Sequence, residues 1–322
     1  MKRSLAAVAL LLALLPGAAA QERTFPSKPL RILLGYTPGG TADIVARLVA
    51  EKLTLALGQP VVVENRPGAS GNVAAQAAAR ATPDGHTMLL GATAEIAINR
   101  HVMKDMGFNP ERDFAPIALG FQVPLALLVP ANSPHAALKD MLESARREPG
   151  KLTFANSGNG TPGHLAGEMI ALKAKVRITQ IPYKAATLAI TDLVSGRIDA
   201  YFLSVPGALP LARSGRVRLI GVSTLRRSSS APDTPTIAEL GIPGFDFVLW
   251  GGFFSPAATP REIVRRLNHE IVQALTQPEM QARLATEGSE VARTTPEEFG
   301  RFVQTESGNY AGIIKQIDYK PE

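Results

Sequence analysis

The sequence predicts an α/β fold in which two lobes are joined by a hinge and enclose a ligand cleft. Three observations predict this fold. The 322 residues are more than one small domain needs. Short apolar runs alternate with helical patterns along the chain, which is typical of α/β proteins. Two further apolar runs, at 114–130 and 218–224, separate a middle block from both ends, so that the chain crosses twice between the lobes.

The composition excludes several classes of protein. Hydrophobic residues make up 45% of the chain and charged residues 19%, which is enough apolar mass for a core and excludes a disordered chain. The absence of cysteine excludes disulfide frameworks, cysteine nucleophiles and thiolate metal sites. One tryptophan, 6% aromatic residues and a formal net charge of +6 give no basis for a nucleic-acid partner.

The first twenty residues have the order of a secretory signal peptide. Two basic residues, Lys2 and Arg3, precede an unbroken apolar run at 5–15, and a Pro-Gly pair then leads to three alanines. The apolar run is too short for a membrane span, which needs about 20 residues. We therefore predict a signal peptide at 1–20 with cleavage after Ala20, which exports the protein and lowers its net charge from +6 to +4.

The first part of the mature chain alternates strands and helices. Residues 30–35 form a short apolar strand, and after a helix that Gly58 ends, residues 60–64 form the next. An alanine-rich helix at 73–81 and a third strand at 87–91 follow. Repeated β-α-β units of this kind predict a largely parallel sheet with right-handed crossovers.

The apolar run at 114–130 is too long for one strand, and we expect Gly120 and Pro124 to break it. A self-contained α/β block follows, with helices at 137–147, 164–172 and 189–195 and strands at 151–155, 177–181 and 198–202. The last hundred residues, after Thr224, are expected to pack back on the first lobe. The predicted lobes are therefore 21–123 plus 224–322 for lobe I and 124–223 for lobe II.

The first candidate ligand loop is Tyr36-Thr37-Pro38-Gly39-Gly40-Thr41-Ala42-Asp43, which lies between a strand and a helix. Paired glycines let the backbone approach a ligand because no Cβ obstructs it. The free N–H groups of the following helix point at the same place and favour an anion. A tight turn with Thr41 as the helix N-cap explains the same residues, so both interpretations stay open at this point.

The second candidate loop is the segment 156–164, Asn-Ser-Gly-Asn-Gly-Thr-Pro-Gly-His, which also follows a strand and opens a helix. Its glycines, Gly158, Gly160 and Gly163, match the G-x-G-x-x-G pattern of dinucleotide-binding enzymes. The acidic residue expected about twenty positions later is missing, because Tyr183-Lys184-Ala185 occupies that region. A small-anion loop of backbone N–H groups and hydroxyls fits better, and a dinucleotide-binding enzyme is the alternative.

No catalytic or metal-binding constellation stands out. His164 and Glu168 share a helix face, but no second ligand pair accompanies them, so we expect no metal site. Neither a G-x-S-x-G elbow nor a phosphate-binding loop of the G-x-x-x-x-G-K-[ST] type occurs. We therefore expect no enzymatic activity and no cofactor.

Seven ordered segments of the chain carry a family resemblance: 25–31 (Phe-Pro-Ser-Lys-Pro-Leu-Arg), Pro38-Gly39-Gly40 through Asp43, 58–68 (Gly-Gln-Pro-Val-Val-Val-Glu-Asn-Arg-Pro-Gly), 83–87 (Pro-Asp-Gly-His-Thr), 113–117 (Asp-Phe-Ala-Pro-Ile), 182–184 (Pro-Tyr-Lys) and 232–236 (Pro-Asp-Thr-Pro-Thr). With these segments the chain resembles the periplasmic solute-binding proteins of tripartite tricarboxylate transporters, often called Bug-type receptors. The resemblance covers essentially all of the mature chain.

The resemblance implies a type II periplasmic-binding-protein fold, a hinged clamshell that closes on a small carboxylate. It implies a monomer in the periplasm whose partners are transporter membrane subunits or a sensor kinase. In the family, backbone N–H groups and waters from two facing loops hold the carboxylate. The ligand-binding residues expected here are Tyr36, Pro38, Gly39, Gly40, Thr41, Asp43, Thr93, Ala94, Glu95, Asn156, Ser157, Gly158, Gly160, Thr161, His164, Tyr183, Lys184, Asp199, Phe202 and Ser204.

Two positions depart from the family pattern or raise a question about the ligand. The family commonly continues Tyr-Lys with Gly, whereas Ala185 follows here, which predicts a narrower far end of the pocket. If Glu95 points into the pocket, it would repel a second carboxylate of the ligand. A ligand with an amino, amide or hydroxyl group opposite its carboxylate would then be expected.

Overall fold

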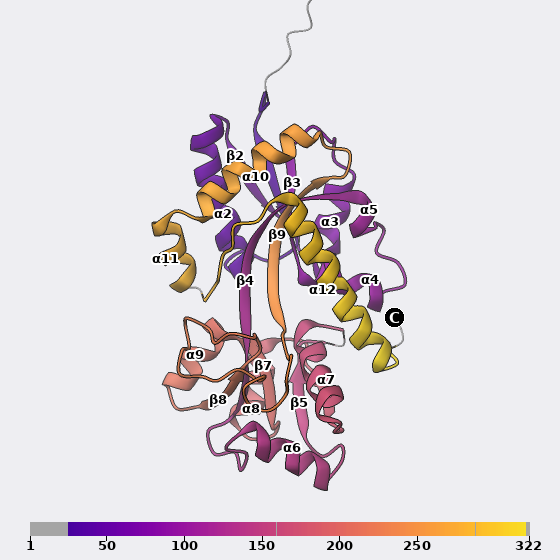
Figure 1. Cartoon of the computed structure of the whole chain (residues 1–322), viewed down its shortest axis with the longest axis vertical. Coiled ribbons are helices and arrows are strands. Elements are labelled where there is room, and N and C mark those ends of the chain that lie inside the picture. The colour runs from indigo at the N-terminus through magenta and orange to yellow at the C-terminus, as the bar shows by residue number, and fades with distance from the viewer. Residues whose placement is uncertain (1–24, 159, 287, 320–322) are drawn as a thin grey trace, which may run out of the picture.

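The structure is a computed structural model that describes residues 25–158, 160–286 and 288–319. The predicted signal peptide, with its cleavage site after Ala20, lies outside these residues. Within them, no helix is both long and apolar enough to cross a membrane. The described chain forms two lobes, one above the other in Figure 1, with long strands running between them.

The first lobe is built on parallel strands at one end of a nine-stranded mixed sheet. Strand β1 (Leu30–Leu34) lies between β2 (Val61–Asn65) and β3 (Thr87–Ala92). The helical elements of this part are α2 (Thr41–Leu57), η2 (Ala69–Gly71), α3 (Asn72–Ala79), η3 (Ala94–Ile98), α4 (Asn99–Val102) and α5 (Pro110–Asp113). The parallel β-α-β order predicted for this region is confirmed.

Apart from the exposed Arg31, strand β1 is buried on both faces, as its otherwise apolar sequence predicts for a central parallel strand. Ile32 and Leu34 share a core cluster with Val45 of α2. Leu33 points to the opposite face and packs in another cluster with Ala74 of α3. Because successive side chains of a strand alternate between faces, β1 anchors helices on both sides of the sheet.

The second lobe repeats the α/β arrangement at the other end of the sheet. Strand β5 (Thr153–Asn156) lies between β6 (Thr179–Pro182) and β7 (Ala200–Ser204) and is parallel to both, and β8 (Val217–Val222) completes the lobe. Its helices are α6 (Leu138–Arg147), α7 (Pro162–Ala174), α8 (Ala186–Val194) and α9 (Val205–Arg213). The block predicted from the sequence contains these elements apart from α9 and β8, and β8 corresponds to the apolar run at 218–224 that was predicted to bound the block.

The two lobes share one strand, β4 (Phe114–Pro130), whose 17 residues run through both of them (Figure 1). The prediction that Gly120 and Pro124 break this run is wrong. Strand β4 pairs antiparallel with β9 (Val248–Pro256) as far as Pro124, and with β7 and β8 from the next residues onward. Pro124 lies where the strand changes partner, and Gly120 lies in a register shift, so neither interrupts the strand.

The segment 224–247 contacts the second lobe. The ring of Phe245 stacks on Phe202 of β7, with ring centroids 6.3 Å apart, and the backbone of the segment bonds to β8. The boundaries predicted from the sequence give this segment to lobe I. From its contacts we propose instead that the second crossing lies near Val248, where β9 begins to pair with Pro124.

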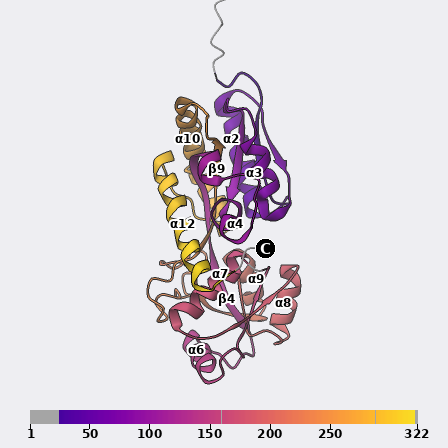
Figure 2. The ribbon, with the colours of Figure 1, turned by 90° about the vertical axis from the view of Figure 1, so that its right-hand side faces the viewer.

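After β9 the chain returns to the first lobe and forms α10 (Arg261–Leu275), α11 (Pro278–Thr286) and α12 (Pro296–Gln316). Helix α10 packs in the same core cluster as α2. Helix α12 lies along β4 and reaches α7 of the second lobe (Figures 1 and 2). Beyond it, the ring of Tyr319 lies edge-on to His164 with centroids 6.3 Å apart, so the C-terminal segment contacts both lobes.

Gly252 in β9 has no room for a side chain, and this generates a test of the packing between the crossing strands. A Cβ there would lie 2.8 Å from the Ala118 carbonyl oxygen of β4 and would overlap the Phe299 ring. Because backbone and a buried ring must both shift, Gly252→Ala is expected to lower the free energy of unfolding by about 1–3 kcal/mol. Urea denaturation measures the difference.

Gly308→Ala in α12 is the matched control. Nothing lies within 4 Å of a Cβ at this exposed position, and alanine is expected to stabilise the helix by up to about 1 kcal/mol. Equal effects of the two substitutions would contradict the packing argument.

Candidate functional site

A cavity of about 530 Å³ lies between the two lobes. The first lobe contributes the segments that follow β1 and β3, and the second lobe contributes the segment that follows β5. Strands β4 and β9 line the cavity where they pass from one lobe to the other. Their lining residues are Phe121, Leu249 and Trp250. A ligand in this space would therefore contact both lobes and the strands that join them.

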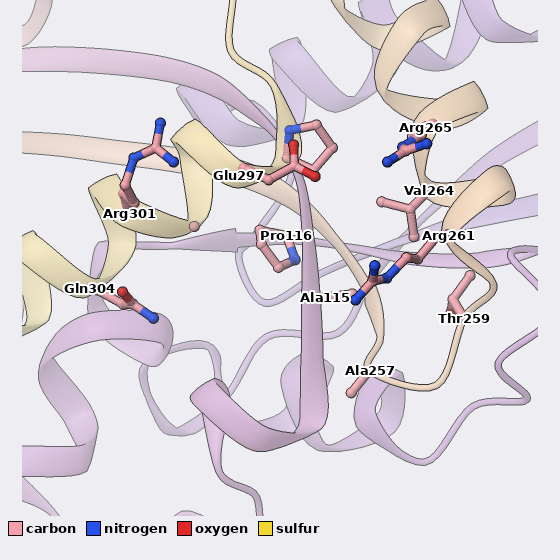
Figure 3. A pocket seen from close by; sticks show the side chains of 12 residues that line it. Ala115, Pro116, Ala257, Thr259, Arg261, Val264, Arg265, Glu297, Arg301 and Gln304 are labelled. Atoms are coloured by element: carbon pink, nitrogen blue, oxygen red, sulfur yellow. The ribbon is translucent and has the colours of Figure 1, made fainter.

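A second cavity, also of about 530 Å³, lies on the outer face of the first lobe between the starts of α10 and α12 (Figure 3). Arg261 and Arg265 extend into it from α10, opposite Glu297 of α12, and all three side chains are exposed. Every residue that lines this cavity belongs to the first lobe or the start of β4. A ligand bound there would not touch the second lobe, so the interlobe cavity is the candidate site for a hinged binding protein.

Helix starts from both lobes face the interlobe cavity. Its lining includes Thr41 at the start of α2, Ser70 just before α3, Ala94 at the start of η3 and Pro162 at the start of α7, where proline has no N–H and the first N–H belongs to Gly163. The first N–H groups of a helix have no intrahelical acceptor and carry partial positive charge. The described residues that line the cavity include no Lys or Arg. The partial positive charge among the lining residues therefore belongs to the backbone of the helix starts, which suits an anion.

The direction of the strands explains why these helix starts converge. Strands β1 and β3 are parallel, so the segments that follow them leave the same edge of the first lobe. In the second lobe the loop after β5 opens α7. Ligands of open α/β sheets bind outside this carboxyl-terminal edge, and here the edges of the two lobes line one cavity.

Asp43 holds the first loop in shape. Its side chain accepts hydrogen bonds from Gly39 N at 3.0 Å, from Asn65 Nδ2 at 2.9 Å and from the Arg47 guanidinium at 2.9 and 3.0 Å. Burial alone would raise the pKa of Asp43, but these donors outweigh burial and lower the pKa below its ordinary value. The carboxylate is thus committed to ordering the loop that leads into α2.

Side chains of the second loop bond to its own backbone. Asn156 Oδ1 accepts from Gly158 N at 2.9 Å, and Thr161 Oγ1 donates to Gly158 O at 2.6 Å. His164 Nδ1 accepts from Gly160 N at 3.2 Å. Burial lowers the pKa of His164 to about 4, so its ring is neutral at pH 7 and can accept this bond. The loop therefore keeps its shape through its own side chains.

Backbone geometry and packing account for two glycines of the second loop. Gly158 and Gly160 have φ angles of +122° and +73°, a region that favours glycine. A Cβ on Gly160 would lie 3.1 Å from Val102 of α4, so the loop meets the first lobe here. Gly163 lies in the first turn of α7, where a Cβ would make only ordinary contacts. The G-x-G-x-x-G match thus has an explanation that is independent of a dinucleotide.

Eight of the residues predicted for the ligand site line the interlobe cavity: Tyr36, Gly40, Thr41, Asp43, Thr93, Ala94, Ser157 and Thr161. Five more order the two loops: Gly39, Asn156, Gly158, Gly160 and His164. That these residues bind a ligand stays a prediction.

Other residues predicted for the site do not line the cavity. Tyr183 donates its hydroxyl to Asp192 at 2.8 Å, and Asp199 accepts from the backbone N–H and hydroxyl of Thr153 at 2.8 and 2.7 Å. Asp199 precedes β7, and since β7 is parallel to β5, this end of the strand points away from the cavity. The other three of this group are Phe202 in the core, Ser204 at the N-cap of α9 and the exposed Lys184; Pro38 is exposed in the first loop.

Glu95 was also expected among the ligand-binding residues, but its carboxyl does not face the cavity. It is 0% exposed, and its Oε2 accepts from the Tyr36 hydroxyl at 2.6 Å and its Oε1 from Ala92 N at 2.8 Å. A Cβ on Gly71 would lie 2.5 Å from the carboxyl carbon, so the carboxyl packs directly on the backbone of that glycine. Burial raises the pKa of Glu95 to about 7, and the bonds from Tyr36 and Ala92 offset only part of this rise.

Thr37, Ala42 and Pro162, which belong to the two predicted loops, line the cavity as well, and the lining residues that the sequence-based reasoning missed are Ser70, Ala92, Phe121, Leu249 and Trp250. Ser70 stands in a glycine-bounded loop after a strand, which was a usable signal, and its φ of +51° places it in a region that favours glycine. Phe121 and Trp250 follow from the topology, since a strand that crosses between lobes must pass the cleft.

The two lobes, the double crossing and the interlobe cavity define a periplasmic-binding-protein fold. The sequence model for the tripartite tricarboxylate transporter family receptor, TctC, matches residues 45–319. The chain belongs to this family of solute-binding receptors. The family and the fold class predicted from the sequence are therefore confirmed.

Curated relatives and solved structures agree with this assignment. The chain is 36% identical over 320 residues to the UPF0065 protein in the tcbD-tcbE intergenic region of a Pseudomonas species, covering 99% of this chain and 94% of that protein. It is 32% identical to protein BugT of Bordetella pertussis, covering 92% and 91%. An R. palustris protein solved with adipate matches with a TM-score of 0.81 at 33% identity, covering 92% and 100%. MatC from Rhodopseudomonas palustris with bound malate matches with a TM-score of 0.76 at 30% identity, covering 90% and 100%.

Asp43→Ala tests whether the first loop depends on its buried carboxylate. Losing the acceptor for Gly39 and Asn65 is expected to lower the free energy of unfolding by about 2 kcal/mol at pH 7. Because the pKa of Asp43 is lowered in the fold, its stabilisation is present above the ordinary carboxyl pKa and is lost as the pH falls below that value. Urea denaturation should therefore show the variant and the wild type converging in acid.

Asp140→Ala is the matched control. Asp140 accepts from Ala137 N at 2.9 Å and caps α6 in the second lobe, outside the cavity lining. Its loss is expected to cost about 1 kcal/mol of stability and to leave carboxylate binding unchanged, whereas Asp43→Ala should weaken binding at least tenfold. Equal binding losses in both variants would contradict a specific role of the first loop.

Proposed function

We propose that the protein is an exported receptor that captures a small carboxylate between its lobes. It presents the closed form to membrane subunits of a tripartite tricarboxylate-type transporter or to a sensor kinase. One observation carries this proposal: helix starts from both lobes converge on one cavity. The described residues that line this cavity include no cationic side chain. Backbone N–H groups at such starts bind carboxylates by hydrogen bonds and by their partial charge.

The wall of the cavity supports a ligand with a hydrocarbon part. Phe121 and the partly exposed Leu249 place apolar side chains beside the polar helix starts. An acid with a short aliphatic chain would bury that chain on this wall while its carboxylate bonds to the backbone. The structural neighbours described with adipate and malate hold dicarboxylic acids, which makes aliphatic dicarboxylates the first class to test here.

Ligand binding and lobe closure are coupled in this proposal. A carboxylate that contacts Thr41 in one lobe and the start of α7 in the other binds the closed arrangement better than an open one. Such differential affinity is what shifts a hinged protein toward its closed state. In keeping with the family resemblance, we propose a monomeric receptor without a cofactor, located in the periplasm after removal of residues 1–20.

A ligand panel tests the proposed function. Adipate, malate and succinate are compared with their neutral dimethyl esters and with NAD and NADP by thermal shift, followed by calorimetry. At least one acid is expected to stabilise the protein, by about 2.7 kcal/mol at a concentration of 100 Kd, and its ester to have no effect. Stabilisation by NAD or NADP and by none of the acids would overturn the proposal in favour of the dinucleotide alternative.

Thr41→Pro tests recognition by backbone. Proline at the first position of α2 removes one N–H that faces the cavity, and it is tolerated there because that N–H has no intrahelical acceptor. Gly40 has φ −81° and ψ 168°, which is compatible with a following proline. The variant is expected to bind the acid at least tenfold more weakly at nearly unchanged stability.

Thr41→Ala is the matched control, because it removes the hydroxyl and keeps the N–H. Its affinity in calorimetry is expected to stay within about threefold of the wild type. A loss as large as that of Thr41→Pro would mean that the hydroxyl, and not the backbone, binds the ligand.

A further inference from the structure

Glu95 lies behind the residues that line the interlobe cavity. It contacts three segments of the chain that contribute lining residues. Its carboxyl accepts from the Tyr36 hydroxyl and from Ala92 N, and it packs on the backbone of Gly71. Tyr36, Ala92 and Ser70, the neighbour of Gly71, all line the cavity. Glu95 is therefore a positioning residue, which acts on a ligand through the groups that it holds and through its charge.

No cationic side chain among the described residues is paired with the Glu95 carboxyl. It takes part in none of the ion pairs between described residues, and only hydrogen bonds favour its charged form. The arginines on neighbouring elements have other partners, since Arg47 of α2 pairs with Asp43 and Arg100 of α4 pairs with Glu111. The site thus combines an unneutralised buried acid with helix starts that attract an anion.

The other titratable groups on the elements around the cavity fall into two sets. Some keep one protonation state near neutral pH, and the rest do not line the cavity. The pKa of Asp43 is lowered, that of His164 is lowered to about 4, and that of His101 on α4 is lowered chiefly by burial. Glu306 of α12 and Asp246, beside the start of β9, have raised pKa values, but neither lines the cavity. The Tyr36 phenol stays protonated because burial and Glu95 raise its pKa.

We propose that carboxylate binding is coupled to protonation of Glu95, so that the receptor takes up a proton together with its ligand. This rests on the proposed function, because it requires a carboxylate in the cavity. A ligand carboxylate at the helix starts and an ionised Glu95 behind them would be like charges separated by one layer of protein. In such surroundings their repulsion is strong, and protonation of the buried acid removes it.

The pKa of about 7 places this equilibrium near neutral pH. A bound anion raises the pKa of Glu95 further, so protons are taken up on binding around pH 7. Affinity is then highest below pH 7, falls as the pH rises and Glu95 ionises, and levels off above the pKa of the bound state. Each pH unit by which the ligand raises this pKa corresponds to a tenfold difference in Kd between the two limits.

Calorimetry between pH 6 and pH 8.5 tests the coupling, with the acid from the panel that binds best at pH 6. The ionisation of the ligand does not change in this range, because simple carboxyl groups titrate near pH 4. For the wild type, Kd is expected to rise about tenfold, and the binding enthalpy at pH 7 to differ between two buffers of unequal ionisation enthalpy, which reports proton uptake. Glu95→Gln keeps an acceptor for Ala92 N and should bind with a flat pH profile and no proton uptake.

Two further variants separate the charge of Glu95 from a purely structural role. Glu168→Gln in α7 changes a partly buried acid that also has a raised pKa and does not line the cavity, and it should keep the wild-type profile. Tyr36→Phe removes a donor that lowers the pKa of Glu95, so it should move the midpoint of the profile to higher pH without abolishing it. This variant retains the carboxyl and tests the coupling even if Glu95→Gln does not fold.

The outcomes distinguish the two proposals. If an acid binds with a flat pH profile, or if Glu95→Gln retains proton uptake, the coupling is wrong and the receptor function stands. If no acid of the panel binds the wild type at pH 6, the proposed function fails and the coupling falls with it. A profile that flattens in Glu168→Gln would assign the proton to another group and would also overturn the coupling.

Discussion

The hydrogen-bonded pairing of β4 with β9, and its continuation with β7 and β8, is the constraint on which the rest of the structure depends. One 17-residue strand belongs to both lobes, so neither lobe can form its sheet without fixing an edge of the other. The two lobes meet along this strand where it changes partners, around Pro124. The same pairing aims the carboxyl-terminal edges of both lobes at one space, and the cavity follows from strand direction rather than from any single side chain.

Electrostatics in this space divide between backbone and side chains in an unusual way. The attraction for an anion comes from helix starts, whose partial charges do not titrate. The opposing charge, Glu95, is a titratable side chain held behind them. The attraction of the helix starts for an anion is the same at every pH, whereas the repulsion from Glu95 depends on its protonation. The affinity of the site therefore responds to pH, which a pocket lined by arginine would not show.

Local patterns in the sequence were sufficient to predict the β-α-β order of the first part of the chain, most elements of the middle block and the two loops at the cavity. Apolar runs and glycine pairs encode these within about ten residues of chain. Long-range pairing decided what the sequence could not show. From the sequence, Pro124 is predicted to break a strand, but β4 changes partner there and continues. Asp199 is predicted to line the cleft, but the direction of β7 places it at the opposite end of the strand. Whether Glu95 faces a cavity or the interior depends on the irregular turn η3, for which its sequence has no clear signal.

The second loop, from Asn156 to His164, is bonded to itself, so a ligand does not have to order it on arrival. Ordering costs of about 0.5–1.5 kcal/mol per immobilised side chain are met during folding instead. The apparent Kd is then the intrinsic Kd divided by the fraction of molecules that are already closed. Helix α12 touches both lobes, and Tyr319 beyond it rests on His164, so these contacts help to set that fraction. Substitutions on the part of this helix that contacts α7 would change the affinity for any ligand through this fraction.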